Sequence, residues 1–277
     1  MKSVLVTGCS TGIGLEAART LKAKGYKVIA SCRKIVDCEA LRSEGFKHVI
    51  ELDLASTESI EKAVQHIDII TEGRLFALFN NGAFGIPGAV EDLSRDALRE
   101  QFETNVFGTH ELTCKLLPML IRHGGSRIVQ NSSVLGFVSV KARGAYAASK
   151  FALEALSDAM RLELQNTDVK ISIIEPGPIA SDFRKNALAN FLRHIDVEKS
   201  RCRDMYQEVL MRLNKEGAST KFTLPASAVV RSLIHALESP KPKIRYHVTV
   251  QTHLMGFLTR VLTDRWLDAF VGKFAKP

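Results

Sequence analysis

The sequence lacks the cysteine patterns that mark disulfide frameworks and metal sites. Its cysteines are odd in number, and neither a CxxC pair nor a His/Cys ligand spacing occurs among them. Disulfide scaffolds and structural zinc sites depend on such patterns, and free thiols are typical of a reducing compartment. We therefore expect no metal site and a cytoplasmic protein. The five cysteines are Cys9, Cys32, Cys38, Cys114 and Cys202.

Long hydrophobic runs and blocks of like charge are also missing. No apolar stretch reaches the roughly 18 residues of a spanning helix. Residues 1–8, MKSVLVTG, lack a charged segment followed by a long apolar one, so we expect no signal peptide. Lys and Arg number 38 against 30 Asp and Glu, a formal charge of +8, but they are spread along the chain. This distribution predicts no nucleic-acid partner and suits a small anionic cofactor.

What the sequence does contain is an alternation of short β-branched runs with helical periodicity. Such alternation predicts a parallel sheet covered by helices on both faces. With 277 residues, 45% of them hydrophobic, the chain can fill one large core. We expect one domain over residues 1–277, a three-layer α/β/α Rossmann-like doubly wound sheet of about seven strands. The predicted strands lie at residues 3–7, 27–31, 48–52, 75–80, 126–131, 170–175 and 245–250.

Two regions depart from this pattern. Residues 178–223 are polar, charged and helix-prone, and they follow a strand end, where open α/β sheets bind ligands, so we predict a helical substrate lid. Residues 253–277 form a predicted amphipathic helical tail, with apolar side chains at helical spacing and Arg260, Arg265 and Lys273 between them. Such a tail can pack on the body, cap the active site or touch a membrane surface, and packing is the commonest of these.

A glycine-rich segment, TGCSTGIG at residues 7–14, joins the first predicted strand to a helix. Glycines permit a tight turn and let N–H groups approach a pyrophosphate at the helix N-terminus. The spacing differs from G-x-G-x-x-G, and a glycine turn alone can be structural, but its position after the first strand favours a dinucleotide. The predicted cofactor contacts here are Gly8, Ser10, Thr11, Gly12, Ile13 and Gly14.

The end of the second predicted strand bears on the choice of dinucleotide. It carries Arg33 and Lys34 and no carboxylate that would bond a ribose 2′-OH. Because Arg33 can make charge-assisted bonds to a 2′-phosphate, we predict NADP(H), with NAD(H) as the alternative. The other interpretation is that both residues are solvated loop charges. Asp53, followed by Leu54, ends the third strand and either contacts the adenine or caps the next helix.

A second group of residues predicts proton-transfer chemistry. Tyr146 and Lys150 are four residues apart, so on a helix they share one face. A phenol with a pKa of about 10 is a poor base at neutral pH, and a neighbouring ammonium group stabilises its phenolate. Ser133, at a strand end, can donate a hydrogen bond to a carbonyl oxygen. An isolated YxxxK is usually a surface pair, but together with the glycine turn it predicts a catalytic site.

These motifs as a set resemble the short-chain dehydrogenase/reductase family over residues 3–185. They are TGCSTGIG, Asn80-Asn81, TNVFG at 104–108, NSS at 131–133, YAASK at 146–150 and EPGP at 175–178. The stretch YAASKFALEA is especially similar to the branch with 17β-hydroxysteroid and retinol dehydrogenases and bacterial NADP-dependent aldehyde reductases. One departure is Asn80-Asn81-Gly82-Ala83, where relatives usually have Asn-Asn-Ala-Gly, which puts the local turn geometry in question.

The resemblance implies roles for individual residues. Tyr146 would exchange the proton, Lys150 would lower its pKa and bind the nicotinamide ribose, and Ser133 would orient the carbonyl. Asn105 would hold a water molecule that completes a proton relay. The family also implies a homodimer or homotetramer built on the helices around Asn105 and Tyr146. Further cofactor contacts carried over from the family are Asn81, Pro176, Gly177, Ile179 and Ser181.

The expected function is an NAD(P)-dependent oxidoreductase that interconverts a carbonyl and an alcohol by hydride transfer, with NADPH-linked reduction favoured. Apolar residues near Ser133 favour an aliphatic or aromatic substrate over a sugar phosphate. A dinucleotide-sensing Rossmann protein without catalysis is one alternative, against which the intact set of Ser133, Tyr146 and Lys150 counts. A nucleotide-sugar epimerase is disfavoured by the glycine spacing. A membrane-surface reductase of retinoids or lipid aldehydes stays open because of the tail.

Overall fold

The computed structural model describes residues 1–215, 217 and 222–274, and its centre is one parallel sheet. The strand order is β3-β2-β1-β4-β5-β6-β7, which confirms the predicted doubly wound fold. The order reverses between β1 and β4, the switch point beside which such sheets bind ligands. The strands are β1 Ser3–Val6, β2 Lys27–Cys32, β3 His48–Glu51, β4 Ala77–Asn80, β5 Arg127–Asn131, β6 Lys170–Glu175 and β7 Arg245–His247.

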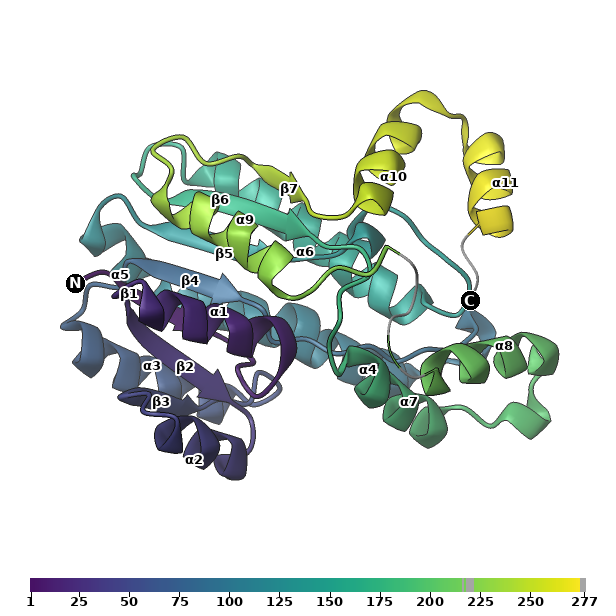
Figure 1. Cartoon of the computed structure of the whole chain (residues 1–277), viewed down its shortest axis with the longest axis horizontal. Helices are drawn as coiled ribbons and strands as arrows, with labels where there is room; N and C mark the ends of the chain where they lie inside the picture. The colour runs from purple at the N-terminus through teal and green to yellow at the C-terminus, as the bar shows by residue number, and fades with distance from the viewer. Residues whose placement is uncertain (216, 218–221, 275–277) are drawn as a thin grey trace.

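Helices cover both faces of the sheet (Figure 1). Helices α1 (Gly12–Ala23), α2 (Ile35–Ser43) and α9 (Ser227–Glu238) pack on one face, and α3 (Thr57–Thr71), α5 (Thr109–His123) and α6 (Gly144–Glu163) pack on the other. Within β1, Val4 and Val6 join the first cluster while Leu5 joins the second. Since both faces are buried, apolar residues dominate the central strands, as in SVLV of β1 and ALFN of β4.

A lobe of two helices stands at the carboxyl ends of the strands (Figure 1). It comprises α7 (Phe183–His194) and α8 (Arg203–Asn214), within the region predicted as a helical lid. Tyr206 is fully buried there, accepts a hydrogen bond from the Ala89 backbone at 2.9 Å and donates one to Asp92. These bonds attach the lobe to the segment that follows β4. Residues 216 and 218–221 of the predicted lid lie outside the described residues.

The C-terminal region differs in detail from the prediction. Strand β7 ends at His247 instead of 250, because the Thr249 side chain accepts a hydrogen bond from the Thr252 backbone and caps helix α10 (Val250–Val261). The predicted tail is two helices, α10 and α11 (Asp264–Phe274), and both extend beyond the sheet (Figure 1). Residues 275–277 of that tail are not described.

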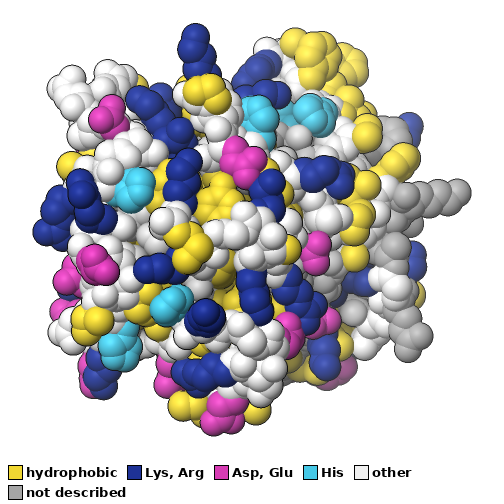
Figure 2. Space-filling view, turned by 60° about the vertical axis from the view of Figure 1, so that its left-hand side comes forward, with side chains coloured by type: hydrophobic (Ala, Val, Ile, Leu, Met, Phe, Trp, Pro, Cys, Tyr) yellow, Lys and Arg dark blue, Asp and Glu magenta, His cyan; other side chains and the backbone are white. Residues whose placement is uncertain are grey.

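The surface charge is mixed. On the face turned forward in Figure 2, Lys and Arg side chains are interspersed with acidic and apolar ones instead of gathering in one area. Among the helices that the structure describes, none combines the length and the apolar character needed to cross a membrane. The expectation of one domain over residues 1–277 stays a prediction.

Candidate active site

A cavity of about 1400 Å³ lies at the carboxyl ends of the strands, between the glycine turn, the α7–α8 lobe and helices α10 and α11. Its lining brings together predicted residues from distant parts of the sequence. The predicted residues that line it are Gly8, Ser10, Thr11, Gly12, Ile13, Asn81, Ser133, Tyr146, Lys150, Pro176, Gly177, Ile179 and Ser181.

Five other predicted residues do not line this cavity: Gly14, Arg33, Asp53, Leu54 and Asn105. Gly14 lies beneath the turn, where a Cβ atom would be 2.1 Å from the Gly8 carbonyl oxygen, so it is required for packing of the turn. Arg33 is exposed directly after β2. Leu54 is buried in the core cluster that includes α3.

Asp53 does not cap the following helix, so that alternative was wrong. Its Oδ1 accepts a hydrogen bond from the Ala55 backbone at 2.9 Å. The N-cap of α3 is Ser56, whose hydroxyl accepts from the Ser59 backbone at 3.2 Å. Asp53 is held just after the carboxyl end of β3 by its own loop, and its contact with a cofactor stays a prediction.

Thr7 and Gly82 hold the glycine turn against the segment after β4. The Thr7 hydroxyl accepts hydrogen bonds from the backbones of Asn81 and Gly82, each at 2.8 Å, and Asn81 Nδ2 donates to the Thr7 carbonyl at 2.9 Å. A Cβ atom on residue 82 would lie 3.2 Å from Leu54 Cδ1 and 3.3 Å from Thr7 Oγ1. The exchanged Gly-Ala pair therefore places the smaller residue where two loops approach closely, and Asn81 keeps its place in the cavity. The structural role of Thr7 was not predicted.

Tyr146 lines the cavity and makes an edge-to-face contact with Phe183, with the ring centroids 5.3 Å apart. Lys150 Nζ is 5.7 Å from the Tyr146 ring centroid. Burial raises the pKa of Tyr146 to about 12, while hydrogen bonding to Ser133 and the charge of Arg143 act in the opposite direction. The phenol is therefore protonated at neutral pH, which is the state of a proton donor.

Lys150 is almost fully buried and donates a hydrogen bond to the Asn131 carbonyl at 2.7 Å. Burial lowers the pKa of Lys150 to about 8, and the nearby Glu154 carboxylate opposes that shift. Asn131 Nδ2 in turn donates to Asn81 Oδ1 at 2.9 Å. The last residue of β5 thus connects Lys150 to the segment that packs on the glycine turn. This link was missed, although the NSS motif contained its residue.

Asn105 sits in a π-helical turn, Glu103–Gly108, that helical periodicity did not predict. Its Nδ2 donates to the Phe84 carbonyl at 2.9 Å and to Ser149 Oγ at 3.1 Å, and its Oδ1 accepts from the Phe84 backbone at 3.1 Å. Ser149 donates to the Tyr146 carbonyl at 2.7 Å. Asn105 therefore lies behind α6 and fixes the backbone that carries Tyr146.

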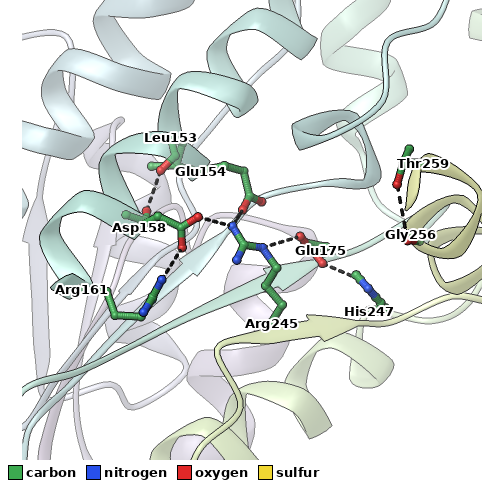
Figure 3. A network of polar contacts seen from close by, with 10 residues as sticks. Leu153, Glu154, Asp158, Arg161, Glu175, Arg245, His247, Gly256 and Thr259 are labelled. Atoms are coloured by element: carbon green, nitrogen blue, oxygen red, sulfur yellow. Dashed lines mark hydrogen bonds and ion pairs between the residues drawn. The ribbon is translucent and has the colours of Figure 1, made fainter. Parts of the chain in front are cut away.

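A partly buried ion-pair network joins α6, β6 and β7 (Figure 3). The Arg245 guanidinium is 2.7 Å from Asp158, 3.0 Å from Glu154 and 3.3 Å from Glu175, and His247 Nδ1 is 2.5 Å from Glu175 Oε2. Burial raises the pKa of Glu154 and of Glu175 to about 7. Three carboxylates thus share one guanidinium, at the junction of α6, β6 and β7.

Known proteins match almost the whole chain. A family model described as short chain dehydrogenase matches residues 2–190. The uncharacterized oxidoreductase YbbO of Escherichia coli (strain K12) is 44% identical over 96% of this chain and 93% of its own. Human retinol dehydrogenase 16 is 33% identical over 95% of this chain and 86% of its own. A Burkholderia phymatum short chain dehydrogenase/reductase solved with NAD aligns with a TM-score of 0.76 at 21% identity, over 98% of this chain and 95% of that one.

The family model covers well over half of the chain, and the fold and the strand order agree with it. The chain belongs to the short-chain dehydrogenase/reductase family of oxidoreductases.

Proposed function

We propose that the protein transfers hydride between a nicotinamide dinucleotide and a carbonyl or alcohol substrate. The observation that carries this proposal is the convergence of Ser133, Tyr146 and Lys150 with the glycine turn on one cavity. When bound, the dinucleotide supplies the hydride. The chain's own residues bind the two reactants, orient them and handle the proton.

The glycine turn fits the pyrophosphate of such a cofactor. Gly8 and Gly12 have positive φ angles of 70° and 58°, conformations that favour glycine. The side chain of Thr11, the N-cap of α1, makes no capping hydrogen bond, so first-turn N–H groups of α1 are available for phosphate oxygens. We assign the predicted residues after β6 to contacts with the nicotinamide end of the cofactor. These residues are Pro176, Gly177, Ile179 and Ser181.

Tyr146 acts as the proton donor to the carbonyl oxygen, which Ser133 also contacts. A phenol whose pKa lies near 12 is protonated under working conditions and suits reduction. Once the phenol has lost its proton, the neighbouring Lys150 ammonium stabilises the phenolate. Asn105 fixes α6 and, by resemblance, holds the water that resupplies the proton.

Arg33 selects NADP(H) in this proposal. Arg33→Asp is expected to raise the KM for NADPH by about 10- to 100-fold and to shift the preference toward NADH, because a charge-assisted bond to the 2′-phosphate becomes a repulsion. The measurement is KM and kcat/KM for both cofactors. Lys34→Asp, one exposed position further on, is the matched control with the same charge change. An unchanged NADPH to NADH ratio in Arg33→Asp would show that another base recognises the phosphate.

The proposed substrate is a carbonyl compound with an apolar body. The cavity beside Tyr146 is lined by apolar side chains, among them Ile86, Val138, Val140 and Leu213. The test follows NADPH and NADH oxidation by the purified protein with aliphatic, aromatic, retinoid and steroid carbonyl compounds. Turnover with any of these supports the enzyme, whereas dinucleotide binding without turnover across the panel supports the sensing alternative.

The exposed apolar face of the C-terminal helices favours a second candidate, a reductase that works at a membrane surface. Large apolar side chains there are exposed, and Arg260 and Arg265 lie among them. These residues suit an anionic lipid surface. The exposed apolar residues are Val250, Leu254, Phe257, Val261 and Trp266.

For this second candidate, the double variant Phe257→Asp/Trp266→Asp is expected to lose at least about 10-fold in partition onto anionic vesicles, since two large apolar contacts are removed. Vesicle sedimentation measures it. Ile35 and Val36, exposed at the start of α2, provide a control double variant of equal charge. Failure of the wild-type protein to bind vesicles would eliminate the membrane-surface candidate and leave the soluble reductase.

We also propose a cytoplasmic homodimer or homotetramer that associates through α5 and α6. Phe107, just before α5, and Phe151, on α6, are exposed apolar side chains on these elements. Contacts between copies there would bury both rings.

A further inference from the structure

An arginine without a partner lines the substrate side of the cavity. Arg143 is the residue before α6, three positions before Tyr146, and its side chain is one of the cavity walls. Among the residues that the structure describes, none forms an ion pair or a side-chain hydrogen bond with its guanidinium. Arg143 is only partly buried and lines the cavity, so its guanidinium is available to an anionic ligand there.

The neighbouring arginines, Arg184 and Arg212, have interaction partners within the protein. Arg184 donates to the Lys215 carbonyl at 2.8 Å and so caps the end of α8. Arg212, also a cavity wall, has an interaction partner. The pKa of Arg143 is lowered to about 10. Burial is the largest cause, and the nearby charge of Arg212 acts in the same direction. The Tyr146 phenol has a smaller effect, which raises the pKa of Arg143. Arg143 and Arg212 thus both line this cavity, which also contains Glu208.

From this arrangement we infer that Arg143 binds a carboxylate of the substrate, so that the substrate is an oxo acid with an apolar chain. The inference rests on the proposed function and narrows its substrate class. A planar guanidinium forms two parallel hydrogen bonds with a carboxylate, which fixes orientation as well as charge. The apolar walls formed by Val138, Val140 and Leu213 accommodate the rest of the chain.

The position of Arg143 relative to Tyr146 matches this use. Both side chains line the same cavity, so one molecule can contact both of them. The positive charge of Arg143 lowers the pKa of the Tyr146 phenol. A bound carboxylate neutralises that charge, which keeps the phenol protonated and ready to donate to the carbonyl oxygen.

The experiment compares oxo acids with their methyl esters as substrates of the purified enzyme, with NADPH oxidation as the readout. Each ester keeps the carbonyl and the chain of its acid and removes only the charge. In the wild-type protein, kcat/KM is expected to be at least about 10-fold higher for the acid. In Arg143→Gln, kcat/KM for the acid is expected to fall about 30- to 100-fold, mainly through KM, while the ester changes less than about 3-fold.

Controls separate charge recognition from structure. Lys141→Gln removes an equal charge from an exposed neighbour outside the cavity and should leave the acid to ester ratio unchanged. Arg143→Lys should restore part of the preference. The melting temperature and the NADPH dissociation constant of Arg143→Gln report on folding.

Equal losses for acid and ester in Arg143→Gln would overturn the inference, because Arg143 would then act on Tyr146 or on folding. A wild-type enzyme that reduces esters as well as acids, or better, would overturn it too and leave the proposed function intact. Absence of Tyr146-dependent turnover with all of the compounds would overturn both.

Discussion

Tyr146→Phe is expected to lower kcat by about 10²- to 10⁴-fold while the dinucleotide still binds, since removal of a general acid costs that much. The substitution deletes one hydroxyl group and keeps the ring, whose packing on Phe183 holds that side of the cavity. Lys150 keeps its bond to the Asn131 carbonyl, which does not depend on the phenol. The loss should therefore appear in kcat and not in cofactor affinity.

The measurement is steady-state reduction with the best substrate of the panel, together with a titration of NADPH binding. Tyr26→Phe is the control, because its hydroxyl donates to the half-exposed Glu238 at 3.2 Å, away from the cavity. Retention of most of kcat in Tyr146→Phe would show that another group supplies the proton.

Arg245→Leu is expected to destabilise the fold by about 3–5 kcal/mol at pH 8, because it leaves buried carboxylates without their cation. Glu154 and Glu175 are nearly inaccessible, and each depends on this guanidinium for charge compensation. Asp158, the third carboxylate, is more exposed and can turn to water or keep its bond to Arg161 at 3.1 Å.

The loss of stability in Arg245→Leu is expected to be larger at high pH than at low pH. Burial raises the pKa of Glu154 and Glu175 from 4.5 in the unfolded chain to about 7 in the fold. The folded state therefore binds more protons between these values, and stability falls as pH rises from about 4.5 to about 7. Without Arg245 both carboxyl pKa values rise further, so the variant should be far closer to wild type at pH 5 than at pH 8.

Urea denaturation at the two pH values measures this difference. Adding Glu154→Gln to Arg245→Leu removes one of the buried charges and should restore part of the stability at pH 8. A loss that is equal at pH 5 and pH 8 would mean that Arg245 contributes packing of its stem and not charge compensation.

The fold could be predicted from the sequence because short β-branched runs alternate with segments whose apolar residues have helical spacing. Strand β6, Lys170–Glu175, matches its predicted range in full. The predicted strand at 245–250 was too long because two residues with strand propensity, Thr249 and Val250, are the N-cap and the first residue of α10. Local propensity does not distinguish these uses of threonine and valine.

The candidate site could be predicted where its residues belong to local motifs, as in the glycine turn and YAASK. The π-helical turn at Asn105 could not, since one widened turn leaves helical periodicity nearly unchanged. Arg143 could not be singled out either. An arginine before a helix is ordinary in sequence, and the cavity that it lines is completed by α8, which follows about sixty residues later.

The cavity has two kinds of wall. Its reactive floor is formed by strand ends and the turns that follow them, which the core fixes in place. Its outer wall comes from α8, α10 and α11, through side chains such as Met211, Leu254, Met255 and Phe270. Met211 and Leu254 are also exposed, so their replacement costs the core little. The scaffold is for this reason highly evolvable: mutagenesis libraries confined to these peripheral helices can diversify the compounds that the cavity accepts while its strand-end floor is inherited unchanged.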